Sequence, residues 1–175
     1  MDEIARGAQL SRALLYVYFK DKAAIMRGLM LRAGQRLLER FHAAQAAGGS
    51  GLEQLQRIGL AYYQFSTESP DYFDVLTDAS TFSHLVDNDE QSVELASCYE
   101  ESMTCMIQSI TAGVADGSLH PDRVADPALT ASYLRGAMHG VILQTRQSDP
   151  CQSVEIPAEQ LIGYTLQMLN YSMRA

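Results

Sequence analysis

Apolar residues recur at steps of three and four along almost the whole of this sequence, whereas alternating apolar and polar residues are short and rare. Steps of three and four place side chains on one face of an α-helix, and alternation would place them on one face of a strand. We therefore predict an all-α fold. With cap residues included, the predicted helices cover residues 2–7, 11–18, 21–47, 52–68, 72–76, 91–115, 126–147 and 157–173.

Helix starts and ends are marked by residues with a suitable capping chemistry. Ser11 and Asp21 can each accept hydrogen bonds from the free N–H groups of a following helix. Asp126 can do the same, and Pro127 after it suits a first helical position. Helices are separated at residues 48–51, which are rich in glycine, and at Asp116-Gly117. The other predicted connections are an acidic loop at residues 82–90, a segment at 121–126 and a loop around Pro150.

Charge is divided unevenly along the chain, whose net charge is −8. Residues 1–42 hold eight basic and four acidic residues, a net of +4, and the rest hold five basic and seventeen acidic ones, a net of −12. This division indicates a head that meets a polyanion and a body that does not, because Lys and Arg drive binding to phosphates. Chance clustering on a solvated helix would give the same pattern, so charge alone leaves both interpretations open.

Several classes of protein are disfavoured. The sequence has no apolar run of membrane-spanning length and no leader segment, so we expect a soluble cytoplasmic protein without a membrane partner. The cysteines are predicted to be free thiols: Cys98 and Cys105 lie about 10 Å apart along a helix, too far to bridge, and Cys151 lies alone in a loop. No metal, cofactor or enzymatic activity is expected, because the histidines fall in separate segments without a nucleophile motif or phosphate loop. These histidines are His42, His84, His120 and His139.

The first thirty residues carry the most specific signal. Two short helices joined by a tight turn at residues 7–10 suit a helix-turn-helix, whose second helix lies in the DNA major groove. The residues Ile4-Ala5, Ala8, Leu10-Ser11 and Leu15-Tyr16-Val17-Tyr18-Phe19-Lys20-Asp21-Lys22 resemble the DNA-binding signature of the TetR family. The resemblance is dense across residues 1–30 and looser across the rest. It implies a three-helix head whose first helix would precede Asp2, and we favour an omitted start over a protein that truly begins here.

The exposed residues of the head suit contact with DNA. Tyr16 and Tyr18 are two positions apart and cannot both be core, so at least one phenol should face outward, where it can donate to a phosphate. Lys22 is predicted in the first turn of a helix, an unfavourable place for a cation unless a phosphate binds there too; an ordinary surface lysine is the alternative. Arg12 is placed for a guanine edge. The resemblance implies that Arg12, Ala13 and Val17 face bases and that Tyr16, Tyr18 and Lys22 hold the backbone. The full predicted DNA-binding set is Ser11, Arg12, Ala13, Leu14, Tyr16, Val17, Tyr18, Lys20 and Lys22.

The apolar side chains expected to pack the head together are Ile4, Ala5, Ala8, Leu10, Leu15 and Phe19. Two positions depart from the family pattern. Gln9 stands where glycine is usual, so a left-handed turn there would be strained. Leu14 stands where a hydroxyl residue is usual, which removes a phosphate hydrogen bond and exposes an apolar side chain, to a thymine methyl group for instance.

The middle of the chain mixes flexible methionines with aromatic residues that carry polar tips. Such a mixture is typical of an apolar pocket with a few orienting groups, and it predicts a hydrophobic or aromatic small-molecule effector. The predicted ligand-binding residues are Tyr62, Phe65, Phe73, Tyr99, Met103, Met106 and His139. For each of them alone, a place in a filled core is the alternative, and for His139 a buried structural role is favoured. The inner side of the helix at 21–47 is expected to carry Met26, Leu29, Met30, Ala33, Leu37 and Phe41.

The last two helices are predicted to form a dimer interface. Apolar stripes run along both, and Gly136 and Gly140, one turn apart, would permit close helix approach. Two such helices from each subunit would make a four-helix interface in a two-fold homodimer, whose heads match a palindromic operator. The predicted interface residues are Leu134, Met138, Val141, Ile142, Leu161, Thr165, Met168 and Leu169.

Together these features predict a ligand-responsive transcriptional regulator. Residues 1–42 would form the helix-turn-helix DNA-binding domain running into the connecting helix, and residues 43–175 the effector-binding and dimerisation domain. We expect a repressor that binds a palindromic double-stranded operator and is released by a small hydrophobic effector. The alternative is a dimeric helical protein that binds a small molecule or a protein partner but not DNA.

Overall fold

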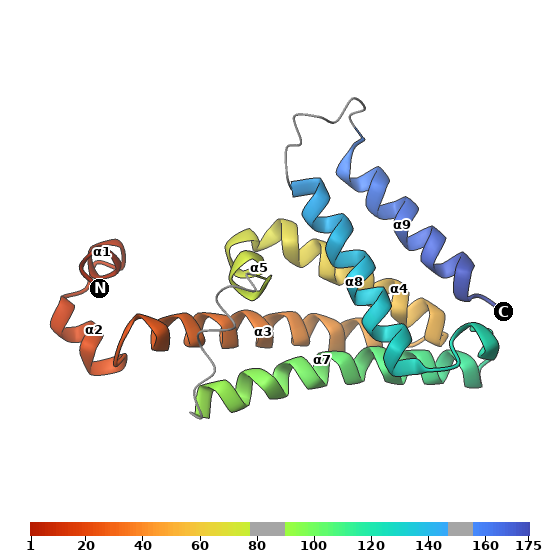
Figure 1. Ribbon diagram of the computed structural model, residues 1–175, viewed down its shortest axis with the longest axis horizontal. Coiled ribbons are helices and arrows are strands. Elements are labelled where there is room, and N and C mark those ends of the chain that lie inside the picture. Colours follow the sequence, from red (N-terminus) through yellow and green to blue (C-terminus); the bar gives the residue numbers. More distant parts are fainter. Residues whose placement is uncertain (78–89, 147–155) are drawn as a thin grey trace.

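The computed structural model describes residues 1–77, 90–146 and 156–175, which form helices and short connections without a strand (Figure 1). This confirms the predicted all-α fold. The helices are α1 (Asp2–Gly7), α2 (Arg12–Tyr18), α3 (Lys22–Ala46), α4 (Gly51–Glu68), α5 (Pro70–Thr77), α7 (Glu90–Ala115), α8 (Pro127–Arg146) and α9 (Ala158–Met173), with a 3₁₀ turn at Pro121–Arg123. Of the acidic loop predicted at 82–90, Glu90 is instead the first residue of α7, and residues 82–89 lie outside the described residues. His84, Gln147, Cys151 and the predicted loop around Pro150 also lie outside them.

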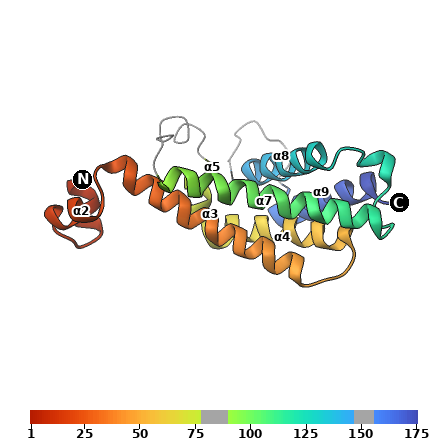
Figure 2. The same ribbon diagram turned by 90° about the horizontal axis from the view of Figure 1, so that it is seen from below.

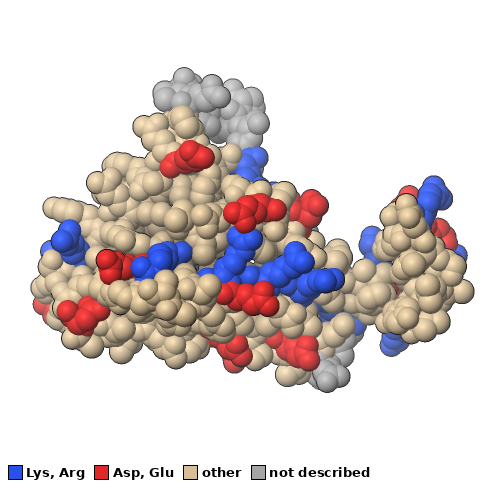
Figure 3. Space-filling view, turned by 180° about the vertical axis from the view of Figure 1, so that it is seen from behind, with Lys and Arg blue, Asp and Glu red and all other residues tan. Residues whose placement is uncertain are grey.

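A small head and a larger body are joined by one long helix. Helices α1 and α2 form the head at one end of the molecule, and α3 runs from them into the body, where it lies beside α4, α5 and α7 (Figures 1 and 2). Helix α8 packs between α7 and α9. The head stands clear of the body as a separate lobe with Lys and Arg side chains on its surface (Figure 3). None of the described helices is long and apolar enough to cross a membrane.

The predicted caps are present. The Ser11 hydroxyl accepts a hydrogen bond from the Leu14 N–H at 3.1 Å, and the Asp21 carboxylate accepts one from the Ala24 N–H at 2.8 Å. Asp126 accepts from two N–H groups of the first turn of α8, at 2.9 and 3.0 Å. These side chains satisfy donors that an α-helix leaves free at its start, which is why the helices begin where the sequence indicated.

Two glycines set the crossing of α4 and α7. A Cβ atom built on Gly51 would collide with the backbone of Gly113 and Ser109, so only glycine allows α4 to approach α7 so closely. The Asp116 carboxylate accepts a hydrogen bond from the Gly51 N–H at 2.8 Å, and the Ser118 hydroxyl accepts one from the next N–H of α4 at 3.2 Å. The start of α4 is therefore fixed to the end of α7.

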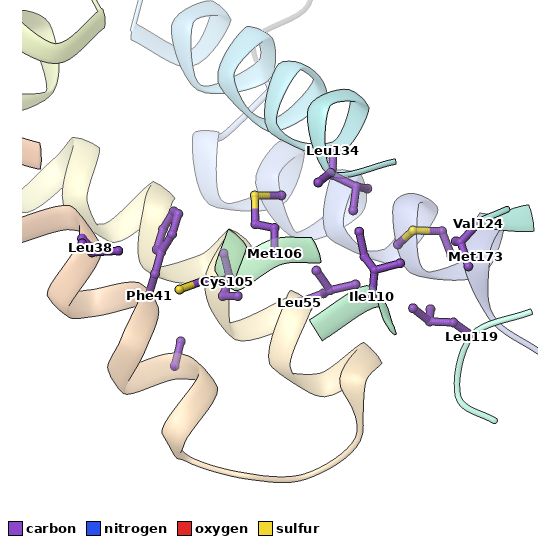
Figure 4. Close-up of a cluster of buried hydrophobic side chains, with 13 residues drawn as sticks. Leu38, Phe41, Leu55, Cys105, Met106, Ile110, Leu119, Val124, Leu134 and Met173 are labelled. Carbon is purple, nitrogen blue, oxygen red and sulfur yellow. The ribbon is translucent and has the colours of Figure 1, made fainter. Parts of the chain in front are cut away.

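The core lies where the long helices of the body meet. Figure 4 shows Phe41, Leu55, Met106 and Leu134 projecting from α3, α4, α7 and α8 toward a common interior. A second cluster joins α3, α4, α5, α8 and α9 through Ala33, Phe65, Phe73, Met138, Ile142 and Ile162.

The expected inner side of α3 is correct in part. Met30, Ala33 and Phe41 are buried, but Leu29 is 39% exposed and Leu38 is buried instead. The reason is that α3 is covered on more than one side, by α4, α5 and α7, so its buried stripe is not the single one that a helix on a flat surface would have.

The head has a small core. Ala5 and Leu15 are buried and Ile4 and Phe19 partly buried, as predicted. The prediction is wrong for Ala8 and Leu10, whose side chains are exposed. Both lie in the turn between α1 and α2, outside the two helices.

Candidate DNA-binding head and ligand cavity

Helix α2 presents almost its entire surface to solvent. Leu15 is its one buried residue, and the nine predicted DNA-binding residues from Ser11 to Lys22 are all exposed. Val17 and Tyr18 are 75% and 72% exposed, and Tyr16 is exposed as well, so both phenols point outward. Large apolar and aromatic side chains gathered on an exposed helix are typical of a binding surface.

Arg12 is held in place at the start of α2. Its guanidinium donates to both carboxylate oxygens of Asp2, at 3.0 and 3.2 Å, and lies 5.6 Å from the centroid of the Tyr16 ring. All three groups are exposed, so the ion pair is weak and can open. The contact links α2 to the start of α1 and aligns Arg12 with the exposed face of α2.

Two further sequence features of the head are found as expected. Gln9 adopts φ = 57°, the left-handed conformation that favours glycine, within the tight turn between α1 and α2. Lys22 is the first residue of α3 and is exposed, immediately after the capping residue Asp21. An anion bound near Lys22 would meet both its ammonium group and the positive end of the α3 dipole.

The body contains a cavity of about 580 Å³, bounded by residues of α3, α4, α5, α7, α8 and α9. Six of the seven predicted ligand-binding residues line it, namely Tyr62, Phe73, Tyr99, Met103, Met106 and His139. Phe65 is not among the lining residues: its ring is fully buried in the second core cluster, with the Arg40 guanidinium 5.6 Å from its centroid.

Most of the cavity wall is apolar. Phe41, Leu55, Ile58, Leu134 and Met138 line it and are buried in the core clusters, together with Phe73 and Met106. The volume and the apolar lining are those of a small-molecule site.

One hydrogen-bonded pair supplies polarity inside. The Tyr62 hydroxyl and His139 Nδ1 are 2.9 Å apart, and both rings stack loosely on Phe73, with centroids at 5.5 and 5.9 Å. Burial raises the pKa of Tyr62 to about 12. Burial lowers the pKa of His139, and the nearby charge of Arg135 lowers it further. At neutral pH the pair is therefore an uncharged phenol and a neutral imidazole.

Arg135 is a lining residue that the sequence analysis missed. It lies on α8 four residues before His139, hence on the same side of the helix, and its guanidinium is 5.1 Å from the centroid of the Tyr99 ring. Arg135, Tyr99 and Glu100 are all exposed, so they mark the place where the cavity opens between α7 and α8. The sequence signal that could have identified Arg135 is its position four residues before His139, which places both on the same side of α8.

Helix α5 is tied to both α3 and α8. The Arg36 guanidinium of α3 lies 4.9 Å from the centroid of the Tyr72 ring. Arg146 of α8 forms an ion pair with Asp74 at 2.8 Å and lies 5.0 Å from the centroid of the Phe73 ring. Since Phe73 also lines the cavity, α5 connects the cavity wall to the long helix that carries the head.

The predicted dimer residues do not share one exposed face. Leu134, Met138 and Ile142 are buried in the chain's own core, so little of their surface is open to a second subunit. Val141, Leu161, Thr165 and Leu169 are half-buried, and Met168 is 48% exposed. The exposed apolar residues of these helices are Leu129 and Tyr133 on α8 and Tyr164, Met168 and Tyr171 on α9.

Gly136 and Gly140 continue the exposed side of α8 that begins at Leu129 and Tyr133, at steps of four and three. A Cβ atom built on either glycine would meet nothing within 4 Å. These glycines are therefore not required by packing within the chain.

The described residues give no sign of a metal site, since no three of their His, Cys, Asp and Glu side chains come together. Cys98 and Cys105 are free, as predicted, and burial raises the pKa of both thiols, which lowers their reactivity.

Comparison with known proteins supports the head and the fold separately. Residues 1–29 match the family model of bacterial regulatory proteins of the tetR family. No curated protein matches the chain significantly in sequence.

Several solved structures have the same fold. A transcriptional regulator of the TetR/AcrR family from Thermobifida fusca YX-ER1 is 23% identical with a TM-score of 0.71, covering 97% of this chain and 84% of that one. FadR from Bacillus subtilis, solved with stearoyl-CoA, is 16% identical with a TM-score of 0.75, covering 98% and 87%. AibR, solved with isovaleryl coenzyme A and operator DNA, is 15% identical with a TM-score of 0.71, covering 95% and 84%.

Proposed function

We propose that this chain, whose residues 1–29 match the tetR family model and whose fold is that of solved TetR-family regulators, is a ligand-responsive transcriptional regulator and not an enzyme. The head would bind operator DNA, and the cavity of the body would bind a small effector. The observation that carries this proposal is the exposure of α2. It presents Arg12, Tyr16, Val17 and Tyr18 on a lobe set apart from the body. A repressor acting in the cytoplasm fits this arrangement best.

In this proposal, α2 enters the major groove. Arg12, Ala13 and Val17 would face base edges, with Arg12 leaving Asp2 to bind a guanine. Tyr16, Tyr18 and Lys22 would bind the phosphates on either side, supported by Ser11 and Lys20, and the apolar side chain of Leu14 would contact a thymine methyl group. The head is then α1, α2 and the first turns of α3, and residues 43–175 form the effector-binding and dimerisation domain.

We further propose a two-fold homodimer, with the exposed face of α8 and α9 as its interface. This face consists of Leu129, Tyr133, Gly136, Gly140, Tyr164, Met168 and Tyr171. Its aromatic side chains suit an interface, and its two glycines would let a partner helix approach closely. Interdigitated helices at such a face would form a four-helix interface. The two heads would then bind half-sites of a palindromic operator.

The effector is proposed to act through α5 and α3. A ligand in the cavity touches Phe73 of α5 and Phe41 of α3, and Arg36 holds α3 to α5. A ligand that binds better to one tilt of α3 than to another would shift the spacing of the two heads. It can shift DNA binding only by the difference between its affinities for the two states.

Salt dependence of DNA binding tests the proposal. The full-length gene product is titrated with the DNA that flanks its own gene, and affinity is measured as salt rises. We expect nanomolar binding to one palindromic fragment and a steep loss of affinity with salt. Lys22→Gln should lower the slope of log affinity against log salt by about one. Arg32→Gln is the matched control, since Arg32 is an exposed cation of α3 about 15 Å further along the helix.

Two results would count against the regulator. One is the absence of preference for any palindrome at low salt. The other is an equal change of slope in the Lys22 and Arg32 variants, which would mean that binding reflects net charge and not the head.

A further inference from the structure

The cavity mouth carries a cation whose donors are not committed to a carboxylate. Arg40 and Arg146 also lie against aromatic rings, but each forms an ion pair at 2.8 Å, with Glu68 and Asp74. Arg135 stacks on Tyr99 and has no carboxylate within ion-pair distance in the part of the chain that the structure describes. A planar guanidinium backed by a ring keeps its outward N–H groups free for an anion.

The interior of the cavity has the opposite character. Its wall is formed by buried apolar side chains, and its hydrogen-bonding pair, Tyr62 and His139, is satisfied internally. Burial lowers the pKa of His139, so this pair adds no positive charge. The site therefore combines an apolar chamber with one cation at its opening.

The mouth limits how much negative charge a ligand can carry. Glu100 lines the cavity together with Arg135, so the charges of the described lining residues sum to zero. A single anionic group can contact the guanidinium and stay clear of the carboxylate. A polyphosphate would place several charges beside Glu100 with only one cation to meet them, which is unfavourable.

We propose that the effector is an apolar molecule with a single carboxylate, bound at the mouth by Arg135, with its apolar part against Phe41, Leu55 and Met106. This rests on the proposed function, because it names the chemical class of that effector. The proposed effector class differs from the coenzyme A thioesters present in the FadR and AibR structures.

Calorimetric binding to the full chain tests this class. The probes are straight-chain carboxylates from hexanoate to hexadecanoate, the corresponding primary alcohols, and dodecanoyl-CoA, all below their micelle concentrations. We expect the best carboxylate to bind about ten- to a hundredfold more tightly than its alcohol, the gain typical of a hydrogen bond to a charged group. It should also bind more tightly than the CoA thioester. Equal binding of carboxylate and alcohol, tighter binding of the thioester, or binding of none of these probes would overturn the proposal.

Variants assign the effect to Arg135. Arg135→Gln should remove the preference for carboxylate over alcohol while leaving alcohol binding unchanged, and Arg32→Gln should leave both unchanged. Unchanged alcohol binding shows that the variant is folded. Persistence of the full preference in Arg135→Gln would overturn the role of this residue.

Failure of the two proposals can be told apart. If the chain binds carboxylates but no operator, the proposed ligand class stands and the proposed regulator is wrong. If it binds an operator but prefers alcohols, the proposed regulator stands and the proposed ligand class is wrong.

Discussion

Replacing Gly51 by alanine tests how tightly the fold depends on the crossing of α4 and α7. The new Cβ would collide with the backbone of Gly113 and Ser109, and backbone atoms cannot rotate aside, so α4 must move. Overpacking of this kind costs about 2–3 kcal/mol at its upper end. Alanine returns about 0.4–1 kcal/mol by restricting the unfolded chain. We therefore expect the free energy of unfolding to fall by about 1–2.5 kcal/mol. For a chain of this size, the midpoint of thermal unfolding would drop by about 2–10 °C.

Gly28→Ala is the matched control. Its Cβ would lie 3.7 Å from Phe19 and from Gln91, which is ordinary contact, and Gly28 is inside the helix α3. This variant should raise the free energy of unfolding by about 0.4–1 kcal/mol. The stability of both variants is measured by thermal unfolding monitored by far-UV circular dichroism. If Gly51→Ala kept or raised the midpoint as Gly28→Ala should, the argument from close backbone approach would be refuted.

Three further predictions concern other parts of the molecule. If the proposed dimer forms, Tyr133→Glu should convert it into a monomer in size-exclusion chromatography with light scattering, whereas Val93→Glu, on an exposed position of α7, should not; monomers from both would argue against this interface. Asp116→Asn should lose stability above pH 3.8 and approach the wild type in more acidic solution. The reason is that hydrogen bonds from Ser118 and the start of α4 lower the pKa of Asp116 below that value. If the difference in thermal unfolding midpoint between Asp116→Asn and the wild type did not change with pH, this reasoning would be contradicted. Asp2→Asn should tighten operator binding by up to about fivefold, since it frees the first arginine of α2 from an exposed ion pair; weaker binding would show that the carboxylate orients that arginine.

The helices could be predicted because the determinants of a helix are local. Ser11, Asp21 and Asp126 each form the cap that their positions indicated, and the apolar steps of three and four were sufficient to separate helix from strand. The strained turn at Gln9 was indicated by the resemblance and not by local chemistry, because glycine is usual at this position of the family pattern. The 3₁₀ turn at Pro121–Arg123 was predicted only as a connection.

The faces of the helices could not be predicted in the same way. Helix α8 has an inner apolar side with Leu134 and Met138 and an outer apolar side with Leu129 and Tyr133. Periodicity identifies both sides, but only tertiary packing decides which is covered by the chain itself. Arg135 was missed for a related reason: a charged residue on a helix suggests solvent, and its place at a cavity depends on how α7 and α8 meet.

In the proposed mechanism, the long helix α3 would make a small change in the cavity large enough to affect contacts between the head and DNA. Gly34 and Phe41 of α3 line the cavity, and Lys22 begins the same helix in the head, twelve residues before Gly34 and hence about 18 Å away. A tilt of about 5° at the cavity would move the head by roughly 1.5 Å over that length. In the proposed dimer both heads would move, and hydrogen bonds to phosphates and bases do not tolerate such a change. An effector of the proposed class that contacts α3 at Phe41 and α8 at Arg135 would set the distance between the two helices. Its length, and not its affinity alone, would therefore decide whether it releases DNA.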